Sequence, residues 1–320
     1  MKILLTGGAG FIGSHTARAL LTRGDEVIII DDFNDYYPPR IKRHNVATLQ
    51  QSFDRLRVYE ADIRDFDTLR TIMYREACQK ICHLAARAGV RASIADPLLY
   101  TQTNVLGTLH LLELAVETGA EHFVYASSSS VYGEMPTAPF REDMPLDKPI
   151  SPYAATKKAC ELLAYTYHHL HGLPCTGLRF FTVYGPAGRP DMAPFLFTWN
   201  IMHGHPITRF GDGSSQRDYT YIDDIVTGVL AALDRPFGYE IFNLGNHRPI
   251  SLNDFIAAIE HAVGAKAIIH EAPRQPGDVS MTCADIAKAR ALLGYEPHTP
   301  FEVGITHFVG WLRANRHLYL

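Results

Sequence analysis

The sequence is poor in cysteine and gives no sign of a disulfide framework. Its 320 residues include five cysteines, an odd number scattered along the chain: Cys78, Cys82, Cys160, Cys175 and Cys283. This usage is typical of reduced thiols in the cytoplasm. One pair of cysteines is spaced four residues apart, but no second Cys or His pair stands at zinc spacing, so no metal site is predicted.

Long apolar runs and an excess of positive charge are also missing. No apolar stretch approaches the ~20 residues that span a bilayer, and Lys2–Leu5 leads into glycines rather than into a signal-peptide core. The 30 Lys and Arg against 34 Asp and Glu give a net charge of −4, which argues against a nucleic-acid binder. We therefore expect a cytoplasmic protein with neither membrane nor nucleic acid as a partner.

What the sequence does have is a regular alternation of short apolar runs and longer amphipathic ones. Hydrophobic residues make up 47% of the chain, enough for a sizeable core. The alternation predicts an α/β fold, a Rossmann-like doubly wound parallel sheet. The expected strands are 2–6, 26–31, 56–60, 80–84, 121–126 and 174–179, and the expected helices lie near 11–23, 41–52, 65–76, 97–118 and 152–171.

The pattern becomes less regular after about residue 180. Short strands are expected at 206–210, 239–243 and 267–270, and helices near 222–234, 251–263, 284–294 and 300–314. We interpret 1–178 as a nucleotide-binding domain and 179–320 mainly as a smaller substrate domain, with segments of the two interleaved.

A glycine-rich turn follows the first predicted strand and opens a helix. Gly7, Gly10 and Gly13 are spaced so that backbone N–H groups can approach a pyrophosphate at the helix N-terminus. Asp31 ends the next predicted strand, where a carboxylate can accept hydrogen bonds from a ribose diol. Asp32 is adjacent and no arginine is close in sequence, so the pattern favours NAD over NADP.

A tyrosine, a lysine and a run of serines are candidates for acid–base chemistry. Tyr153 and Lys157 lie four residues apart in the predicted helix 152–171, which puts both side chains on one face. An ammonium close to a phenol favours the phenolate, so Tyr153 is a candidate acid–base. The serines 127–130 follow the strand 121–126, at the sheet edge where parallel strands hold ligands.

Together these motifs resemble the extended short-chain dehydrogenase/reductase family across nearly the whole chain. The matching segments are Gly7–Gly13, Asp62-Ile63, His83–Ala86, Asn104-Val105, Ser127–Gly133, Tyr153–Lys157, Arg179–Pro186 and Arg217–Tyr219. The resemblance implies that Tyr153 and Lys157 are catalytic together with Ser128, with Ser129 and Ser130 as register alternatives. It further implies an NAD site that includes Phe11, Ile12, Asp62, Ile63, Leu84, Ala85, Ala86, Asn104, Tyr153 and Lys157 beside the glycines and Asp31–Asp32.

The serine run also narrows the reaction that the resemblance implies. Family members that dehydrate or decarboxylate sugar nucleotides carry carboxylates in this loop, whereas here none occurs before Glu134. This leaves epimerisation at C4 of a UDP-sugar. Segments 85–91 and 182–192 resemble those of UDP-glucuronate 4-epimerases. The alternatives are 4-epimerisation of UDP-glucose or UDP-N-acetylglucosamine, and a non-catalytic NAD-binding sensor or scaffold.

The same resemblance implies a set of substrate-binding residues. A sugar carboxylate calls for a cation and hydroxyl donors, for which Arg189 and Thr182 are the first candidates and Arg87 and Arg91 the second. Arg217 resembles the family's diphosphate-contacting arginine. The Gln275–Asp278 segment resembles an R-x-G-D motif, with Gln275 in place of the commoner Arg and Asp278 on the uridine ribose.

The predicted helix 97–118 has one apolar face, formed by Leu106, Leu109, Leu112 and Val116. Such a face by itself indicates packing against the sheet. Since the family pairs two such helices across a dimer, the resemblance also leads us to expect a homodimer.

Overall fold

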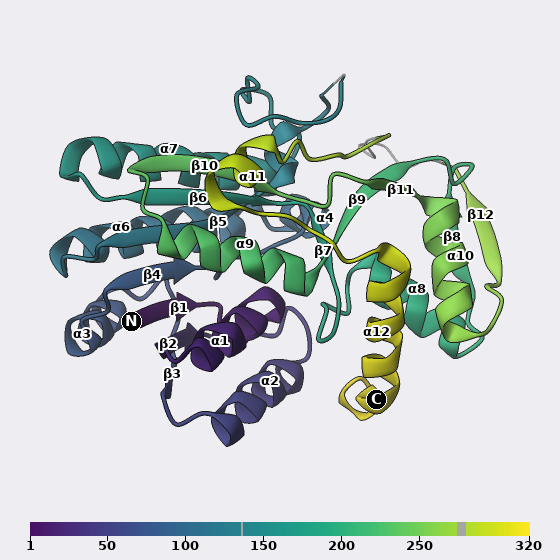
Figure 1. Cartoon of the computed structure of the whole chain (residues 1–320), viewed down its shortest axis with the longest axis horizontal. Coiled ribbons are helices and arrows are strands. Elements are labelled where there is room, and N and C mark those ends of the chain that lie inside the picture. Colours follow the sequence, from purple (N-terminus) through teal and green to yellow (C-terminus); the bar gives the residue numbers. More distant parts are fainter. Residues whose placement is uncertain (136, 274–279) are drawn as a thin grey trace.

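The computed structural model describes residues 1–135, 137–273 and 280–320, and its centre is a parallel sheet of seven strands (Figure 1). The strand order is β10-β6-β5-β4-β1-β2-β3, which confirms the predicted Rossmann-like architecture. The strands are β1 (Lys2–Thr6), β2 (Glu26–Asp31), β3 (Leu56–Glu60), β4 (Lys80–His83), β5 (His122–Ser128), β6 (Cys175–Phe180) and β10 (Tyr239–Leu244).

Helices cover both faces of this sheet. One face carries α1 (Phe11–Arg23), α2 (Pro39–Ser52) and α9 (Ile222–Asp234), and the other carries α3 (Phe66–Glu76), α6 (Gly107–Glu117) and α7 (Pro152–His171). The alternation of side chains along a strand supplies both cores. In β1, Ile3 and Leu5 join the core under α1 and α9, whereas Leu4 joins the core under α3 and α6.

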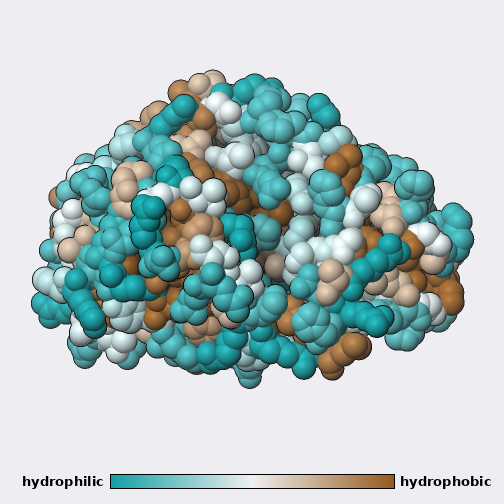
Figure 2. Space-filling model, turned by 60° about the horizontal axis from the view of Figure 1, so that its bottom comes forward, coloured by the Kyte–Doolittle hydropathy of each residue, from teal (hydrophilic) through white to brown (hydrophobic). Residues whose placement is uncertain are grey.

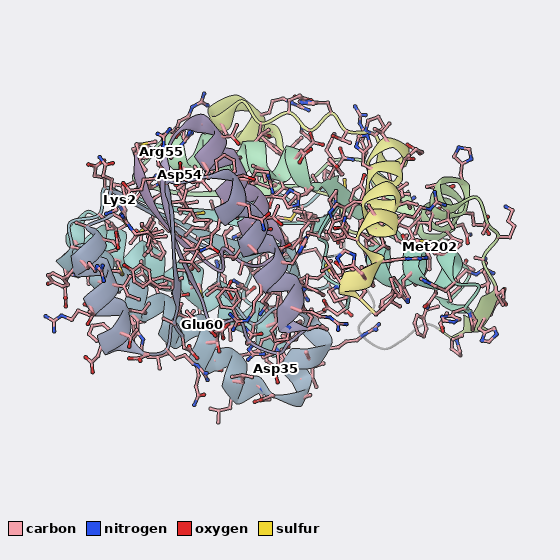
Figure 3. The ribbon with its side chains drawn as sticks, turned by 90° about the horizontal axis from the view of Figure 1, so that it is seen from below. Lys2, Asp35, Asp54, Arg55, Glu60 and Met202 are labelled. Atoms are coloured by element: carbon pink, nitrogen blue, oxygen red, sulfur yellow. The ribbon has the colours of Figure 1, made fainter. Side chains whose placement is uncertain are left out.

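The strands all point toward one edge of the sheet, and the candidate site lies at that edge. Figure 3 shows Lys2 and Arg55 together at the edge where β1 and β3 begin, and Glu60 at the opposite edge, near Asp35. The glycine turn after β1 and the aspartates after β2 therefore meet at the carboxyl edge, as expected for a parallel sheet.

The rest of the C-terminal half builds a smaller body beside this edge (Figure 1). A three-stranded sheet has the order β11-β9-β7, and β12 pairs with β8. The elements are β7 (Thr182–Tyr184), α8 (Ala193–Met202), β8 (Ile207–Phe210), β9 (Gln216–Tyr221), β11 (Pro249–Ser251), α10 (Leu252–Val263), β12 (Ile269–Ala272) and α12 (Phe301–Ala314). Stacked aromatic rings, such as Tyr219 on Phe255 at 4.7 Å, fill its core.

The chain passes between the two bodies more than once. After β9 it returns to the large sheet, where α9 covers one face and β10 pairs with β6 along the outer edge. The helix α11 (Ala287–Leu293) also packs on β10 and α9. The division at residue 178 with interleaved segments stays a prediction.

Several elements differ from those expected. The single helix expected at 97–118 is α5 (Pro97–Tyr100), a π-helical turn η1 (Thr101–Leu106) and α6. The structure adds α4 (Val90–Ala95), α8, β7, β9 and β11 and the short turns η2 (Ser129–Tyr132) and η3 (Arg316–Leu318). On the predicted apolar face, Leu112 is buried against the sheet, whereas Leu106 is exposed.

On the face shown in Figure 2, polar residues cover most of the surface, with apolar residues in scattered patches between them. Among the described residues, no helix has both the length and the apolar character that a membrane crossing requires. In the same residues, no three His, Cys, Asp or Glu side chains are grouped to hold a metal ion.

Candidate active site

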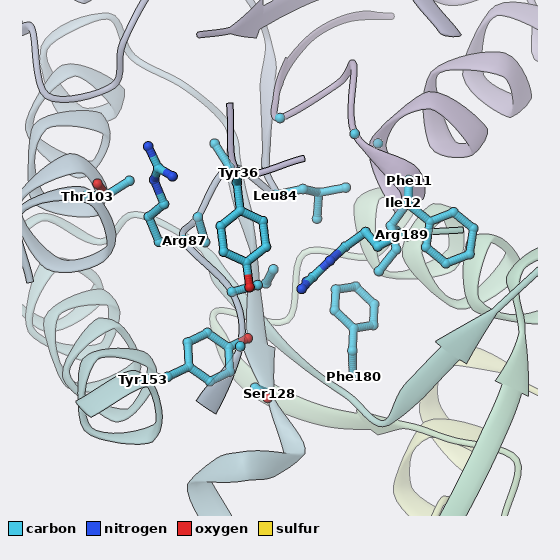
Figure 4. Close-up of a pocket in the computed structure, with 18 of the residues that line it drawn as sticks. Phe11, Ile12, Tyr36, Leu84, Arg87, Thr103, Ser128, Tyr153, Phe180 and Arg189 are labelled. Atoms are coloured by element: carbon cyan, nitrogen blue, oxygen red, sulfur yellow. The ribbon is translucent and has the colours of Figure 1, made fainter. Parts of the chain in front are cut away.

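A cavity of about 710 Å³ lies at the carboxyl edge of the large sheet (Figure 4). Its size falls in the range of small-molecule and cofactor sites. The fold brings most of the predicted site residues to its walls: Gly7, Gly10, Phe11, Ile12, Gly13, Asp31, Asp32, Asp62, Ile63, Leu84, Ala85, Ala86, Arg87, Arg91, Ser128, Ser129, Ser130, Tyr153, Lys157, Thr182 and Arg189.

Four predicted residues are not placed on these walls. Asn104 is buried behind the wall, where its side chain bonds the backbone N–H and C=O of Arg87 at 2.8 and 3.0 Å. It therefore holds the segment that carries Arg87. Arg217 lies in β9, away from the cavity lining. Gln275 and Asp278 fall outside the described residues.

The glycine turn is closed so tightly that side chains are excluded from it. Gly7 has a φ of +69°, and a Cβ there would lie 2.7 Å from the backbone nitrogen of Ala85. A Cβ on Gly13 would lie 2.1 Å from the carbonyl oxygen of Gly7. Gly10 caps α1 without a side-chain hydrogen bond. The first-turn N–H groups of α1 therefore meet the cavity directly, an arrangement that fits a diphosphate.

Two acidic side chains stand at the ends of neighbouring strands. Asp31 accepts hydrogen bonds from the backbone N–H groups of Ala9 and Phe33, both at 3.0 Å. Burial nevertheless raises the pKa of Asp31 above its ordinary value. Burial also acts to raise the pKa of Asp62, but hydrogen bonds from Arg64 outweigh it, so the pKa of Asp62 is lowered. Both carboxylates are thus held in place before any ligand binds.

Tyr153 and Lys157 lie in the first turns of α7. The helix starts cleanly because the Ser151 hydroxyl accepts from the Ala154 N–H and Pro152 stands in the first turn. Lys157 is buried, and its Nζ donates to the carbonyl oxygen of Ala126 at 2.7 Å. This bond ties the helix that carries Tyr153 to the end of β5.

The serine turn begins at Ser128, the last residue of β5, which lies close to Tyr153 in Figure 4. We use the name serine turn for Ser128–Val131. The Ser128 hydroxyl oxygen accepts hydrogen bonds from the Ser130 N–H at 3.2 Å and from the Ser130 hydroxyl at 2.8 Å. Because Ser128 accepts from both groups, its own hydroxyl proton stays available for a ligand oxygen.

Arg189 reaches into the cavity from the side opposite Tyr153 (Figure 4). Its Nε and Nη2 donate side-on to the Asp191 carboxylate at 3.0 and 2.5 Å, and its guanidinium lies 5.3 Å from the centre of the Tyr36 ring. Burial opposes the charge, but Asp191 outweighs it and the pKa of Arg189 is raised. The end-on edge of the guanidinium has no partner among these contacts.

Sequence reasoning missed several residues that line the cavity. Tyr36, Tyr37 and Lys42 come from the loop after β2 and from α2, Phe180 ends β6, and Asp191 lies in the loop between β7 and α8. A Cβ on Gly89 would lie 2.7 Å from the Tyr36 hydroxyl, so this tyrosine depends on a glycine far away in sequence. Only the Arg189-x-Asp191 spacing offered a signal, because a short loop can pair an arginine with a carboxylate two residues on.

Comparisons with known proteins agree with this geometry. The family model described as GDP-mannose 4,6 dehydratase matches residues 4–308. A UDP-glucuronate 4-epimerase of Thermodesulfobacterium geofontis is 47% identical over 314 residues, with 98% of this chain and 96% of that protein covered.

Two solved structures are similar along the whole chain. One is a UDP-glucuronic acid 4-epimerase from Bacillus cereus in complex with UDP-glucuronic acid and NAD, with a TM-score of 0.92, 37% identity and coverage of 98% and 100%. The other is a UDP-glucose 4-epimerase from Thermotoga maritima with UDP-glucose, with a TM-score of 0.90, 31% identity and coverage of 99% and 100%. The chain thus belongs to the GDP-mannose 4,6-dehydratase family of extended short-chain dehydrogenases/reductases.

Proposed function

We propose that this protein is an NAD-dependent UDP-glucuronate 4-epimerase that forms UDP-galacturonate through a transient 4-keto sugar. The observation that carries the proposal is one cavity in which Tyr153 and Ser128 lie opposite Arg189, and whose lining also includes Lys157 and Thr182. Relatives and structural neighbours named as UDP-glucuronate 4-epimerases support it.

The residues at the carboxyl edge fit NAD. The glycine turn and the first turn of α1 suit the diphosphate, Asp31 suits a ribose diol, and Asp62 with Ile63 suits the adenine. Leu84–Ala86 would lie along the cofactor and Lys157 against the nicotinamide ribose. When bound, NAD takes up the hydride from C4 of the sugar and returns it to the opposite face.

Tyr153 acts as the acid–base of the reaction. As phenolate it takes the proton of the C4 hydroxyl, and it gives the proton back after the sugar has turned over. Ser128 donates its free hydroxyl proton to the same oxygen, because Ser130 already donates to Ser128. Ser129 and Ser130 remain the register alternatives.

The serine turn also fits epimerisation better than dehydration. A dehydratase needs an acid and a base beside C5 and C6 of the sugar in addition to the tyrosine. Here the first carboxylate after the serines is Glu134, which is exposed and is not among the described residues that line the cavity.

The substrate carboxylate is assigned to Arg189 and Thr182. Side-on pairing with Asp191 leaves the Nη1 and Nη2 edge of Arg189 for a second carboxylate in end-on geometry. Oxidation at C4 turns glucuronate into a β-keto acid, which loses CO2 when the C–C bond aligns with the carbonyl π system. Arg189 and Thr182 would hold the carboxylate out of that alignment, with Arg87 and Arg91 as second choices.

The nucleotide end of the substrate is assigned to the smaller body. Arg217 would contact the diphosphate, as in the family motif. Gln275 and Asp278 keep the same proposed roles, at the diphosphate and the uridine ribose.

The first experiment is to incubate the purified protein with UDP-glucuronate, without added NAD, and to follow the sugar by proton NMR. UDP-galacturonate without loss of CO2 is the expected result, and it also indicates a tightly held cofactor. Conversion of UDP-glucose or UDP-N-acetylglucosamine alone would contradict the proposed substrate. A wild type that converts no UDP-sugar, even with NAD added, would favour the scaffold alternative.

The matched variants are Arg189→Ala and Arg141→Ala. Arg141 forms the same side-on pair with Asp143, but on the exposed surface outside this cavity. Arg189→Ala should weaken UDP-glucuronate binding and release a UDP-4-keto-pentose, while Arg141→Ala behaves as wild type. If Arg189→Ala binds UDP-glucuronate as tightly as the wild type and releases no UDP-4-keto-pentose, the assignment of the substrate carboxylate to Arg189 is wrong.

Two further properties belong to the proposal. A homodimer is supported by exposed apolar side chains on the contacting elements α5, η1 and α7, namely Leu98, Leu106, Leu162 and Tyr165. A cytoplasmic location is supported by the five cysteines, all of them free thiols.

A further inference from the structure

A fully buried ion pair lies directly behind the serine turn. Glu161 in α7 is 0% exposed and Arg179 in β6 is 1% exposed. The Arg179 Nε and Nη2 donate to the two Glu161 oxygens at 2.8 and 2.9 Å. Burial acts to raise the pKa of Glu161, but the bonds from Arg179 outweigh it, so the pKa is lowered and the pair stays charged.

Glu161 holds the residue that precedes the serine turn. The buried Ser127 hydroxyl donates to Glu161 Oε1 at 2.7 Å. Ser127 also lies opposite Arg179 in the register of β5 and β6. The ion pair therefore fixes the side chain of Ser127, the residue immediately before the serine turn.

Arg179 holds the residue that follows the serine turn. Its Nη1 donates to the Tyr132 hydroxyl at 2.9 Å, and its guanidinium lies 5.0 Å from the Tyr132 ring centre. The Tyr132 hydroxyl in turn donates to Asn243 Oδ1 in β10 at 2.7 Å. One ion pair thus fixes both ends of the turn that carries Ser128, Ser129 and Ser130.

The same helix presents Tyr153 to that turn. Tyr153, Lys157 and Glu161 are spaced four residues apart in α7, so their side chains follow one face. Lys157 is bonded to the Ala126 carbonyl and Glu161 to the Ser127 hydroxyl. These two consecutive anchors set the distance between Tyr153 and the serine turn.

We propose that Glu161 and Arg179 are positioning residues that hold the serine turn in register with Tyr153. The inference rests on the proposed function, because it concerns the proton transfer assigned to Tyr153 and Ser128. Stability alone does not account for the pair, since a buried ion pair is seldom more stabilising than apolar side chains of the same volume. Its fixed geometry is what a proton-transfer site requires.

The test removes single hydroxyls and leaves the ion pair in place. Ser127→Ala and Tyr132→Phe each break one link to the turn. The matched control is Thr176→Val, which removes a buried hydroxyl from β6, the strand of Arg179, where it bonds His122 at 2.9 Å. Glu161→Gln is added as a third variant, and the two hydroxyl variants keep the test valid if that one does not fold.

In steady-state turnover of UDP-glucuronate, Ser127→Ala and Tyr132→Phe should each lower kcat roughly 10- to 100-fold relative to the wild-type protein. KM and Tm should stay close to those of Thr176→Val. The deuterium isotope effect for substrate labelled at C4 should change, because proton and hydride movements share one geometry. If the role is purely structural, Ser127→Ala, Tyr132→Phe and Thr176→Val should all lower Tm to the same extent and leave kcat unchanged. That result would overturn the inference.

Hydrogen exchange separates this inference from the proposed function. Without substrate, the peptide covering 127–133 should exchange faster in Ser127→Ala and Tyr132→Phe than in Thr176→Val. Unchanged exchange would overturn the inference even in an active epimerase. Faster exchange in a protein that converts no UDP-sugar would instead contradict the proposed function.

Discussion

At the scale of single residues, the Arg189 guanidinium is paired with one carboxylate, that of Asp191, and is proposed to bind a second, that of the substrate. Asp191 holds Arg189 side-on, and the guanidinium lies over the Tyr36 ring. The guanidinium edge that is not bonded to Asp191 therefore points in one fixed direction. A freely rotating arginine would have to give up side-chain entropy when the substrate binds. Asp191 removes that cost in advance and keeps the local charge near zero.

The first prediction concerns Asp191. In Asp191→Ala the Arg189 guanidinium loses its fixed direction, so KM for UDP-glucuronate should rise roughly tenfold, the effect of about 1.4 kcal/mol, and released CO2 should become detectable. A coupled assay measures the released CO2, and NMR follows the conversion of UDP-glucuronate. Asp143→Ala, which breaks the matching exposed pair with Arg141, is the control. Equal behaviour of the two variants would contradict the orienting role.

The sequence predicted the residues whose spacing is local and missed those placed by distant contacts. Gly7–Gly13 and Tyr153–Lys157 are each set by one turn or one helix, so their spacing, together with the strands and helices around them, predicted site residues, and the structure places them on the walls of one cavity. Tyr36 is placed by Gly89 and Asp191, and no local pattern encodes such contacts. Asn104 illustrates a further limit, because its motif predicted a site residue but not that it lies behind the wall.

At the scale of elements, the strand–turn–helix unit β1–α1 has no room for a methyl group. Gly13→Ala would place a Cβ 2.1 Å from the Gly7 carbonyl oxygen. Such overpacking costs about 1–3 kcal/mol, so NAD affinity should fall roughly 10- to 100-fold. Bound NAD in the purified protein, measured after denaturation, reports this loss.

The control for this substitution lies in α12. A Cβ on the exposed Gly310 meets no atom within 4 Å. Gly310→Ala should leave bound NAD unchanged and raise the free energy of unfolding by up to about 1 kcal/mol. Full NAD occupancy in Gly13→Ala would show that the turn can relax around the methyl group.

A buried histidine ties three elements together beneath the cavity. His83 in β4 bonds the hydroxyls of Thr6 in β1 at 2.7 Å and Thr108 in α6 at 2.9 Å. Burial lowers the pKa of His83 to about 3. Below pH 6.5, the unfolded chain therefore binds a proton that the folded chain does not, and stability falls as the pH drops from 6.5 toward 3.

This linkage gives a pH prediction. Between pH 7.5 and pH 5, His83 should account for a loss of about 2 kcal/mol in the free energy of unfolding. In urea titrations at both pH values, His83→Gln should reduce the difference by that amount. The exposed His261 provides the control, since His261→Gln should leave the difference unchanged. If the free energy of unfolding changes equally between pH 7.5 and pH 5 in His83→Gln and His261→Gln, the loss is not due to His83.

Element prediction succeeded where hydrophobic periodicity is strong and failed where it is weak. The inner strands of the large sheet are short and mostly buried, and the boundaries of all seven strands agree with those expected to within a few residues. The helix α8 is apolar on most sides and shows no helical period, and β7 and β9 are defined by pairing with each other. The π-helical turn at Thr101–Leu106 interrupts a pattern that otherwise reads as one helix.

At the scale of the whole molecule, the proposed dimer can be tested through its apolar surface. Leu162 in α7 is 59% exposed, and a charge there would be buried without a partner in a dimer. Leu162→Glu should therefore convert a dimer into a monomer in light scattering at micromolar concentration. Leu292→Glu, on the exposed side of α11, should leave the mass unchanged. A monomeric wild type would contradict the proposal.

The order of the strands also has a consequence for how the protein is made. β6 pairs with β5 on one side and with β10 on the other, and β10 follows it by some sixty residues in the chain. Because the ribosome adds about 5–20 residues per second, β6 lacks its outer partner strand for several seconds during synthesis. An unpaired strand edge invites pairing with other chains. A fragment ending at residue 181, just after β6, should thus aggregate unless residues 239–244 are supplied, and synthesis speed across 181–244 becomes a determinant of yield.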